Sequence, residues 1–396
     1  MGFDFSFSPD QEAFRAAARA FLEREVAPHV AAMDATETFP RESIARLRAD
    51  GYFGIPVPEA WGGLGLGKVG YCLFLEELGR VDASHGAIVG AHTSLGTTPL
   101  LAFGTDDQKR RWLVPAARGE RLLAFSLTEP GSGSDSGALT TAAAPDGDGF
   151  RLTGTKLYVT NGAEADTVVV FAATDAARGA NGGVTAFLVD RGTDGFTVGR
   201  QEKKMGLHGT STAELRFDGA RVGPEHVLGG VGRGFIVAMT ALDVGRVSLA
   251  ASMLGAMQAA LEQAVGFARA RTQFGHPISE FQGVQFPLAD IAMHVHALRY
   301  LVYHAAAHQD AMGPDPAAWS RLDRHRKTTE SAMVKCLASE WGGAAIDAAL
   351  QVHGGLGYIQ GTPIERAYRD ARVARIFEGT NEIQRLLIAR ELFGRP

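Results

Sequence analysis

The chain has 396 residues, 45% hydrophobic and 21% charged, with 39 basic and 44 acidic side chains and a formal net charge of −5. This length suits two or three domains with a large buried core. The slightly acidic balance excludes a protein that relies on a basic surface to hold nucleic acid. Two cysteines, Cys72 and Cys336, are too few for a disulfide framework or a structural zinc site. We therefore expect no metal and a reducing compartment such as the cytoplasm.

The first segment, residues 1–123, has the pattern of a helical domain. Ser8, Pro9 and Gln11 match a capping box, and Phe14 and Phe21 recur at helical spacing. Further helices are predicted over residues 41–50, 71–81 and 106–117. No apolar run reaches the roughly 18 residues of a membrane span, and no secretory signal opens the chain.

Residues 65–70 spell GxGxxG, a pattern found in dinucleotide-binding loops. Such a loop follows a strand, but here a turn precedes it. We therefore interpret these glycines as an irregular loop between helices.

The middle segment, residues 124–232, changes to strand-like periodicity. Residues 166–175 and 183–192 have the pattern of buried strands. In residues 212–217, apolar Ala213, Leu215 and Phe217 alternate with polar residues, which indicates a half-buried strand. This segment is predicted to form a β domain.

The third segment, residues 233–396, is helical again, with longer helices. Leu288, Ile291, Val295, Leu298 and Val302 follow the 3, 4, 3, 4 spacing of a helix-bundle seam. The predicted fold class is thus α+β: an α-helical N-terminal domain, a central β domain and a C-terminal bundle.

Two glycine-rich stretches in the middle segment are candidates for a binding site. Residues 125–137, FSLTEPGSGSDSG, leave a strand end and expose backbone N–H groups and hydroxyls that can approach a phosphate or a flat ring. A flexible polar linker is the alternative. Tyr158, in residues 157–162, could pack on such a ring or equally in the core.

Two further stretches stand at helix ends in the third segment. Arg271 could bind a pyrophosphate with its planar fork of donors, or could cap the carbonyls of the preceding helix. Residues 351–358, QVHGGLGY, form a glycine turn after a helix. Alone, His353 is more often a structural histidine than a catalyst.

Glu378 has unusual neighbours, because it lies between the apolar pair Ile376–Phe377 and the flexible pair Gly379–Thr380. Thr380 or Asn381 can cap the last helix, which leaves Glu378 in the loop before it. In apolar surroundings its pKa would be raised, as a general base near neutral pH requires. The alternative is a surface acid that interacts with the helix dipole.

Taken together, these stretches resemble the acyl-CoA dehydrogenase family over essentially the whole chain. The motifs LTEPGSGSD, YVTNG, RTQFG, QVHGGLGY and FEGTNEIQR stand in the family's order and spacing. The resemblance implies an α-helical N-terminal domain (1–123), a central β-barrel-like or β-sandwich domain (124–232) and a C-terminal four-helix bundle (233–396). It also implies a homotetramer built as a dimer of dimers.

The resemblance implies FAD as cofactor, held between the β domain and the bundle. The β-domain residues that would hold it are Phe125, Ser126, Leu127, Thr128, Ser134, Tyr158, Val159 and Thr160. Residues that would reach FAD across a subunit interface are Arg271, Phe274, Gln282, Gln351, Val352, His353, Gly354 and Gly355. Thr380, Asn381 and Glu382 would also touch the cofactor, at a helix N-terminus suited to anions.

Glu378 matches the family's catalytic base. Some relatives carry the glutamate on a bundle helix instead, at the position of Gly245, which cannot supply a base. The implied substrate is an acyl-CoA, contacted by Ser134, Asp243, Val244, Gly245, Arg246 and Gly379. Phe377 replaces the more usual tyrosine before the base, so acyl chain length is open, with a lean towards short to medium straight chains.

The implied reaction converts an acyl-CoA to a trans-2-enoyl-CoA, as in fatty-acid β-oxidation. Glu378 would take the α-proton, hydride would pass to FAD, and electrons would then go to an electron-transfer flavoprotein. Alternatives are an oxidase that gives electrons to oxygen, and a flavin-binding assembly protein without activity. The lack of a long C-terminal extension and the presence of Glu378 favour the dehydrogenase.

Overall fold

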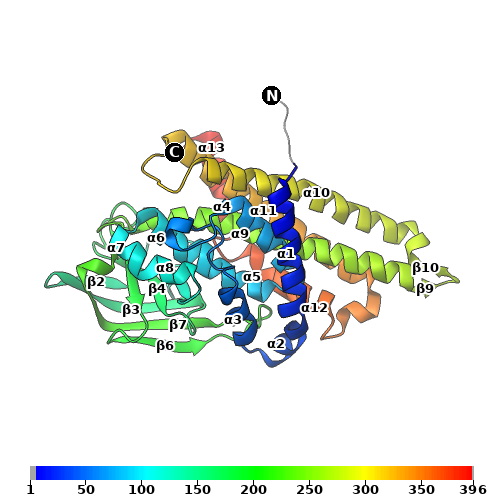
Figure 1. The fold of residues 1–396 in the computed structure, drawn as a ribbon, viewed down its shortest axis with the longest axis horizontal. Coiled ribbons are helices and arrows are strands. Elements are labelled where there is room, and N and C mark those ends of the chain that lie inside the picture. The colour runs from blue at the N-terminus through cyan, green and yellow to red at the C-terminus, as the bar shows by residue number, and fades with distance from the viewer. Residues whose placement is uncertain (1–5, 395–396) are drawn as a thin grey trace.

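A computed structural model describes residues 6–394 of the chain. In Figure 1 the strands gather at the left, long helices run across the molecule to the right, and the β9–β10 hairpin lies at the far right end. The described part is therefore α+β, with helical parts on both sides of the sheet domain in the sequence.

The N-terminal part is helical, as predicted. The capping box is present: the Ser8 hydroxyl accepts a hydrogen bond from the Gln11 N–H at 3.2 Å, and the Gln11 side chain accepts one from the Ser8 N–H. The helices are α1 Pro9–Glu25, α2 Val30–Thr36, α3 Arg41–Ala49, α4 Gly67–Val81, α5 Ala83–Gly90, α6 Thr98–Phe103, α7 Asp106–Gln108 and α8 Val114–Ala117, with π-helical turns η3 Ala91–Thr97 and η4 Lys109–Leu113.

Sequence periodicity missed the helical run from α5 to α6. This run is rich in glycine, threonine and serine, which are poor helix formers. Burial stabilises it instead, because its residues are mostly buried against α4 and α9. The GxGxxG stretch follows a short 3-10 turn, Glu59–Trp61, rather than a strand, and α4 begins inside it. The interpretation as an inter-helix loop is therefore confirmed.

The middle part is a mixed sheet. Its strands are β1 Leu123–Ser126, β2 Ala142–Asp146, β3 Gly149–Thr160, β4 Thr167–Ala173, β5 Val184–Asp190, β6 Phe196–Gln201, β7 Thr212–Val222 and β8 Val227–Leu228. The order is β6-β7-β3-β2-β4-β5-β8, and β1 pairs parallel with β4. The predicted strands appear as β4, β5 and β7, and Ala213, Leu215 and Phe217 all point into the core.

The C-terminal part is a helix bundle. Its helices are α9 Gly234–Ala270, α10 Gln282–Ala311, α11 Arg321–Val352, α12 Pro363–Ala371 and α13 Asn381–Phe393, and the hairpin β9 Thr272–Gln273 with β10 His276–Pro277 joins α9 to α10. The predicted seam is confirmed, because Ile291, Val295, Leu298 and Val302 are buried and Leu288 packs against them.

Helix α9 is long and apolar enough to cross a membrane, with a mean hydropathy of 1.5 in its most apolar window. However, 83% of that window is buried inside the protein. Helices α4, α10 and α11 all pack against it. We conclude that α9 is the core helix of the bundle.

A buried ion cluster ties α1 and α10 to α4. Glu76 is fully buried and accepts hydrogen bonds from Arg15 at 3.2 Å, from Arg299 at 2.8 Å and from the Tyr303 hydroxyl at 2.6 Å. Removing one member of a buried ion cluster leaves the other charges without compensation.

We expect Glu76→Ala to lower the free energy of unfolding by about 3 kcal/mol, since both arginines would lose a buried partner. The measurement is the thermal midpoint of unfolding. Glu12→Ala on the exposed face of α1 serves as the control. An equal midpoint for both variants would contradict a stabilising role for the cluster.

Candidate active site

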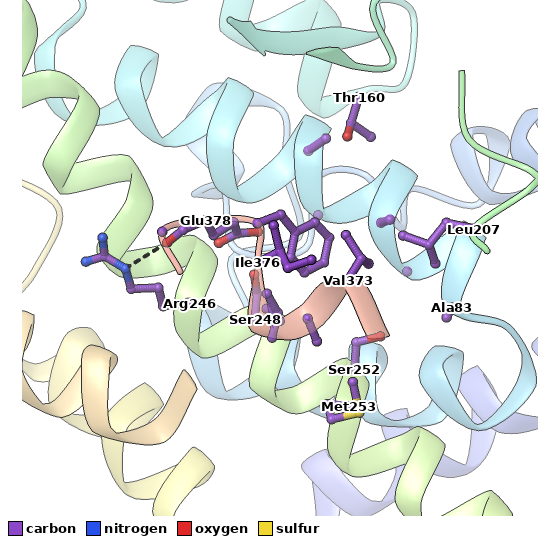
Figure 2. Close-up of a pocket in the computed structure, with 18 of the residues that line it drawn as sticks. Ala83, Thr160, Leu207, Arg246, Ser248, Ser252, Met253, Val373, Ile376 and Glu378 are labelled. Atoms are coloured by element: carbon purple, nitrogen blue, oxygen red, sulfur yellow. Dashed lines mark hydrogen bonds between the residues drawn. The ribbon is translucent and has the colours of Figure 1, made fainter. Parts of the chain in front are cut away.

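A cavity of about 1130 Å³ lies between the sheet domain and the helices. Its walls come from the loop after β1, the end of β3, helices α5, α9 and α12, and the loop before α13. Figure 2 shows Thr160 on one side and Glu378, Ser248 and Ser252 on the other. Segments far apart in the sequence thus meet around one space.

Glu378 lies in the loop between the 3-10 turn Arg372–Arg375 and α13, and its side chain lines this cavity. Thr380 is the N-cap of α13, since its hydroxyl accepts the Ile383 N–H at 3.4 Å. The backbone carbonyl of Glu378 accepts hydrogen bonds from Arg246 Nε and from the Gln384 amide, each at 3.3 Å (Figure 2 marks the first). The loop is therefore held from both sides.

The Glu378 carboxylate is shielded from water. Its Oε2 atom is buried and has no hydrogen-bond partner within residues 6–394, although the residue as a whole is partly open to the cavity. Burial raises the pKa of Glu378 to about 7, while the nearby charges of Arg246 and Lys335 oppose this shift. Of the two interpretations of this residue, the shielded carboxylate is the one that the structure shows.

Lys335 is a buried cation that sequence reasoning missed. It lies on α11, and its Nζ donates to the Gly379 carbonyl at 2.8 Å and to Asn381 Oδ1 at 3.0 Å. Burial lowers its pKa to about 8, and the charge of Glu378 opposes that shift. A lysine within a small, apolar helix face, SAMVKCLAS, was the available signal.

Gly245 lies directly beside the carboxylate. A Cβ atom built on Gly245 would lie 2.3 Å from Glu378 Oε2 and 2.8 Å from Leu95 Cδ2. Both distances are far below van der Waals contact, so no larger side chain fits while Glu378 keeps its position. A side chain at position 245 would therefore point at the place that the carboxylate now occupies.

Backbone strain gathers at the cavity. Among the described residues, six non-glycine residues have positive φ, and three of them, Tyr158, Leu207 and Glu378, line the cavity. Left-handed backbone is costly for residues with a Cβ and concentrates at functional sites. Glu378 has φ of +56° and is followed by Gly379 at +90°, so glycine carries the second left-handed residue of the turn.

Most β-domain candidates line the cavity, but two do not. Phe125, Leu127, Thr128, Ser134, Tyr158 and Thr160 line it. Because successive side chains in a strand alternate between faces, Ser126 and Val159 point into the sheet core instead and are buried. These two side chains face away from the cavity, so any contact of Ser126 or Val159 with a ligand there would come from the backbone.

The α9 candidates divide by helix face. Arg246 lines the cavity, as does Gly379 from the loop. Asp243 holds the Arg246 guanidinium through a 2.9 Å contact and lines a second cavity beside Lys327 and Trp319. Val244 is buried on the other side of the helix, two residues or about 200° from Leu242. Its side chain is therefore outside the lining of this cavity, and its substrate contact stays a prediction.

The candidates assigned to a subunit interface lie away from the cavity of their own chain. They occupy the ends of α9 and α11, the β9–β10 hairpin and the start of α10, and α9 meets α11 where Phe267 stacks on His353 at 4.7 Å. Phe274 is 93% exposed and Tyr358 is 86% exposed. Members of this exposed end surface are Arg271, Phe274, Gln282, Gln351, Gly354, Gly355 and Tyr358, together with the half-buried Val352 and His353.

The three residues at the start of α13 differ in environment. Thr380 lines the cavity. Asn381 is buried and donates to Ser339 Oγ and Glu340 Oε1, each at 2.9 Å. Glu382 is exposed and outside the cavity lining. Direct contact of the Asn381 and Glu382 side chains with a ligand in this cavity is therefore not supported.

The fold and the site define a protein in which a shielded carboxylate lies beside a large cavity between a β domain and a helix bundle. The chain belongs to the acyl-CoA dehydrogenase family. Models of the family's N-terminal, middle and C-terminal domains match residues 8–120, 124–220 and 232–393. The recognised resemblance and the enzyme class are thereby confirmed.

The similar proteins are themselves acyl-CoA dehydrogenases. An acyl-CoA dehydrogenase of Bacillus subtilis is 44% identical over 97% of this chain and 98% of that protein. The mitochondrial short-chain specific acyl-CoA dehydrogenase of Mus musculus is 42% identical, over 96% of this chain and 89% of that protein.

Solved structures of related proteins have the same fold. Butyryl-CoA dehydrogenase from Megasphaera elsdenii has a TM-score of 0.93 and 38% identity, covering 98% of this chain and 100% of that one. A structure described as the electron transferring flavoprotein of Acidaminococcus fermentans has a TM-score of 0.93 and 41% identity, covering 99% of this chain and 100% of that one. The chain is thus short-chain-like among its relatives.

FAD is the cofactor of this family, and the cavity fits it. The wall from the β domain offers the hydroxyls of Thr128, Ser134 and Thr160. In the same loop, Cβ atoms built on Gly131 and Gly133 would meet nothing within 4 Å, so the loop leaves open space for a large ligand. When bound, FAD supplies the two-electron acceptor for the hydrogen removed from the substrate.

Proposed function

We propose that the protein catalyses the α,β-dehydrogenation of an acyl-CoA thioester to a trans-2-enoyl-CoA, with Glu378 as the base. The observation that carries this proposal is the unpartnered, shielded Oε2 atom of Glu378 in the cavity, with a pKa of about 7. A carboxylate in this state can accept a proton from a weak carbon acid near neutral pH.

The reaction removes one proton and one hydride. Glu378 Oε2 would take the α-proton, and FAD held against the β-domain wall would supply the acceptor for the β-hydrogen and its electron pair, so that the double bond forms between the two carbons. Negative charge grows on the thioester oxygen during this step. The backbone N–H of Glu378 makes no hydrogen bond within residues 6–394, so it is available to that oxygen. Such a donor contributes about 3 kcal/mol.

Arg246 and Lys335 position the base rather than react. Arg246 holds the Glu378 carbonyl, and Lys335 holds the Gly379 carbonyl. The N–H that would meet the thioester belongs to Glu378, and the two held carbonyls belong to Glu378 and Gly379. Holding these carbonyls fixes the backbone of the turn and therefore the direction of the N–H. Ile376 and Phe377 also line the cavity, and they keep water from the carboxylate.

We also propose a homotetramer in which the exposed end surface of one chain completes the FAD site of its neighbour. Phe274 and Tyr358 on that surface are large apolar side chains open to solvent in the single chain, as at protein interfaces. We further propose that an electron-transfer flavoprotein accepts the electrons, which the similarity to a chain in such a flavoprotein structure supports. We also propose a cytoplasmic location.

The test is anaerobic reduction of the bound flavin by a panel of acyl-CoA thioesters. Bleaching of the flavin with formation of enoyl-CoA is expected. If no thioester bleaches it, the protein is not a dehydrogenase. Rapid oxygen consumption without a flavoprotein acceptor would show an oxidase instead.

The pH dependence of the reaction should follow Glu378. The base must be ionised, and its pKa is raised to about 7, so kcat/KM should rise about tenfold per pH unit below about 7 and level off above it. Because the charge of Lys335 lowers the Glu378 pKa, Lys335→Met should move this limb to higher pH. A profile that is flat from about pH 5 to pH 8 would contradict Glu378 as the base.

A further inference from the structure

The cavity extends well beyond Glu378, along α9. The α9 residues that line it beyond the carboxylate include Arg246, Ser248, Ser252 and Ala256, and the lining continues to Gln263. Figure 2 shows Ser248, Ser252 and Met253 following one another along this helix, with Ala83 facing the far end. We call this part, bounded by α5, α9 and α12, the distal limb.

Helix α5 and the turn after it run antiparallel to α9 along the limb. At the catalytic end, Leu95 and Glu378 meet the Cβ position of Gly245. Further along, the Cβ position of Gly86 lies 2.6 Å from Ser252 Oγ. Residues 86–95 therefore pair in reverse with residues 245–252, and the limb begins at the carboxylate.

The α5 wall of the limb is lined by small side chains, whereas α9 contributes the larger Leu249 and Met253. Ala83, Ala87, Ala91 and Leu95 line it at a spacing of four, which places them on one face of the helical run. All except Leu95 are alanines. Gly90 also lines the cavity, and a Cβ built on it would meet nothing within 4 Å. Opposite them, Ala367 and Ala371 of α12 line the same space.

The far end of the limb is polar. Asp82, just before α5, is buried and its Oδ1 has no hydrogen-bond partner within the described range. Asp370 on α12 lines the cavity beside it, and burial together with the charge of Asp82 raises the pKa of Asp370 to about 7. An apolar ligand would therefore end before this pair.

The length of the apolar part can be read from the helix. From Gly245 to Ala256 there are 11 residues, which at 1.5 Å each span about 17 Å. With C–C bonds of about 1.5 Å, a butyryl chain reaches at most about 5 Å from its carbonyl carbon, and at least about eleven bonds are needed to cover the limb. A four-carbon chain would leave most of it empty.

We propose that the distal limb is the acyl-tail site and that it accepts straight saturated chains of up to about twelve carbons, so that medium-chain thioesters are better substrates than butyryl-CoA. This inference rests on the proposed function and concerns its substrate class. It differs from what the short-chain names of the relatives would suggest, because the small residues of α5 leave that side of the limb open.

The first test is binding to the Glu378→Gln variant, which does not turn the ligand over. Each buried CH₂ group is worth about fourfold in affinity. We expect octanoyl-CoA to bind at least about tenfold more tightly than butyryl-CoA by titration calorimetry. Equal affinities would overturn the inference.

The second test places a larger side chain in the limb at two different distances from Glu378. Gly90 lies five residues, or about 7 Å, from Leu95, so Gly90→Leu should meet an octanoyl tail but not a butyryl one. The kcat/KM ratio of octanoyl-CoA over butyryl-CoA should fall about 10- to 100-fold, as expected for overpacking. Ala256→Leu lies deeper and should lower the ratio of dodecanoyl-CoA over octanoyl-CoA instead.

Gly266→Leu is the matched control. Gly266 is an exposed residue of α9 outside the cavity lining, with nothing within 4 Å of its Cβ position. Its chain-length profile should match that of the unmodified protein. Suppose that butyryl-CoA bleaches the flavin, longer chains are not preferred, and neither Gly90→Leu nor Ala256→Leu has an effect. That result would overturn the tail site but not the proposed function. If no thioester bleached the flavin, the proposed function itself would be overturned.

Discussion

Replacement of Glu378 by glutamine is expected to lower kcat/KM by about 10²- to 10⁴-fold, or about 3 to 5 kcal/mol of barrier, with FAD still bound. Glutamine keeps the size of the side chain but cannot accept the proton. It also removes the cost of burying a charge at Oε2, which has no partner within residues 6–394. The fold should therefore be at least as stable as before.

The measurement combines three readings on one sample: the flavin spectrum, acyl-CoA affinity and anaerobic flavin reduction. Only the third should be lost. Glu12→Gln, an exposed change on α1, controls for the substitution itself. If Glu378→Gln reduced flavin as fast as the unmodified protein, the base would have to be another residue.

The fold could be predicted largely from periodicity. The bundle seam at 291–302 and the alternation at 213–217 are regular, and the structure confirms both. The run from α5 to α6 could not be predicted in this way, since its glycines and threonines form a helix only because neighbouring helices bury it. The helical structure of that segment therefore depends on tertiary packing, which a local sequence pattern does not show.

The candidate site shows the same division. The apolar neighbours of Glu378 correctly indicated a shielded carboxylate, because local sequence sets its immediate surroundings. Ser126, Val159 and Val244 were assigned to the site together with whole stretches, and the strand and helix periods turn their side chains away from the cavity. Lys335 is brought to the loop by α11, 43 residues earlier in the chain than Glu378, and sequence spacing cannot show such a contact.

Moving the base to the neighbouring helix should restore part of the activity lost without Glu378. In Glu378→Gly, activity should fall by about 10²- to 10⁴-fold. Adding Gly245→Glu should recover at least about tenfold, because the Cβ of residue 245 would stand 2.3 Å from the present Oε2 position. Glycine also suits the left-handed φ of +56° at position 378, so the loop should tolerate the exchange.

The single change Gly245→Glu should behave in the opposite way. Two carboxylates would then share one shielded space, and the new side chain would crowd Leu95, whose Cδ2 lies 2.8 Å from the Cβ position. Overpacking costs about 1 to 3 kcal/mol, so both thermal midpoint and activity should fall.

The four kcat/KM values form a double-mutant cycle, in which the two changes should be strongly non-additive because the residues touch. Gly245→Gln in the Glu378→Gly background has the shape of the rescuing side chain without its proton acceptor. If that glutamine restored as much activity as the glutamate, refilled space rather than a relocated base would explain the recovery. A gain seen only with glutamate would show that the reaction needs a carboxylate at this point of the cavity, whichever helix or loop supplies it.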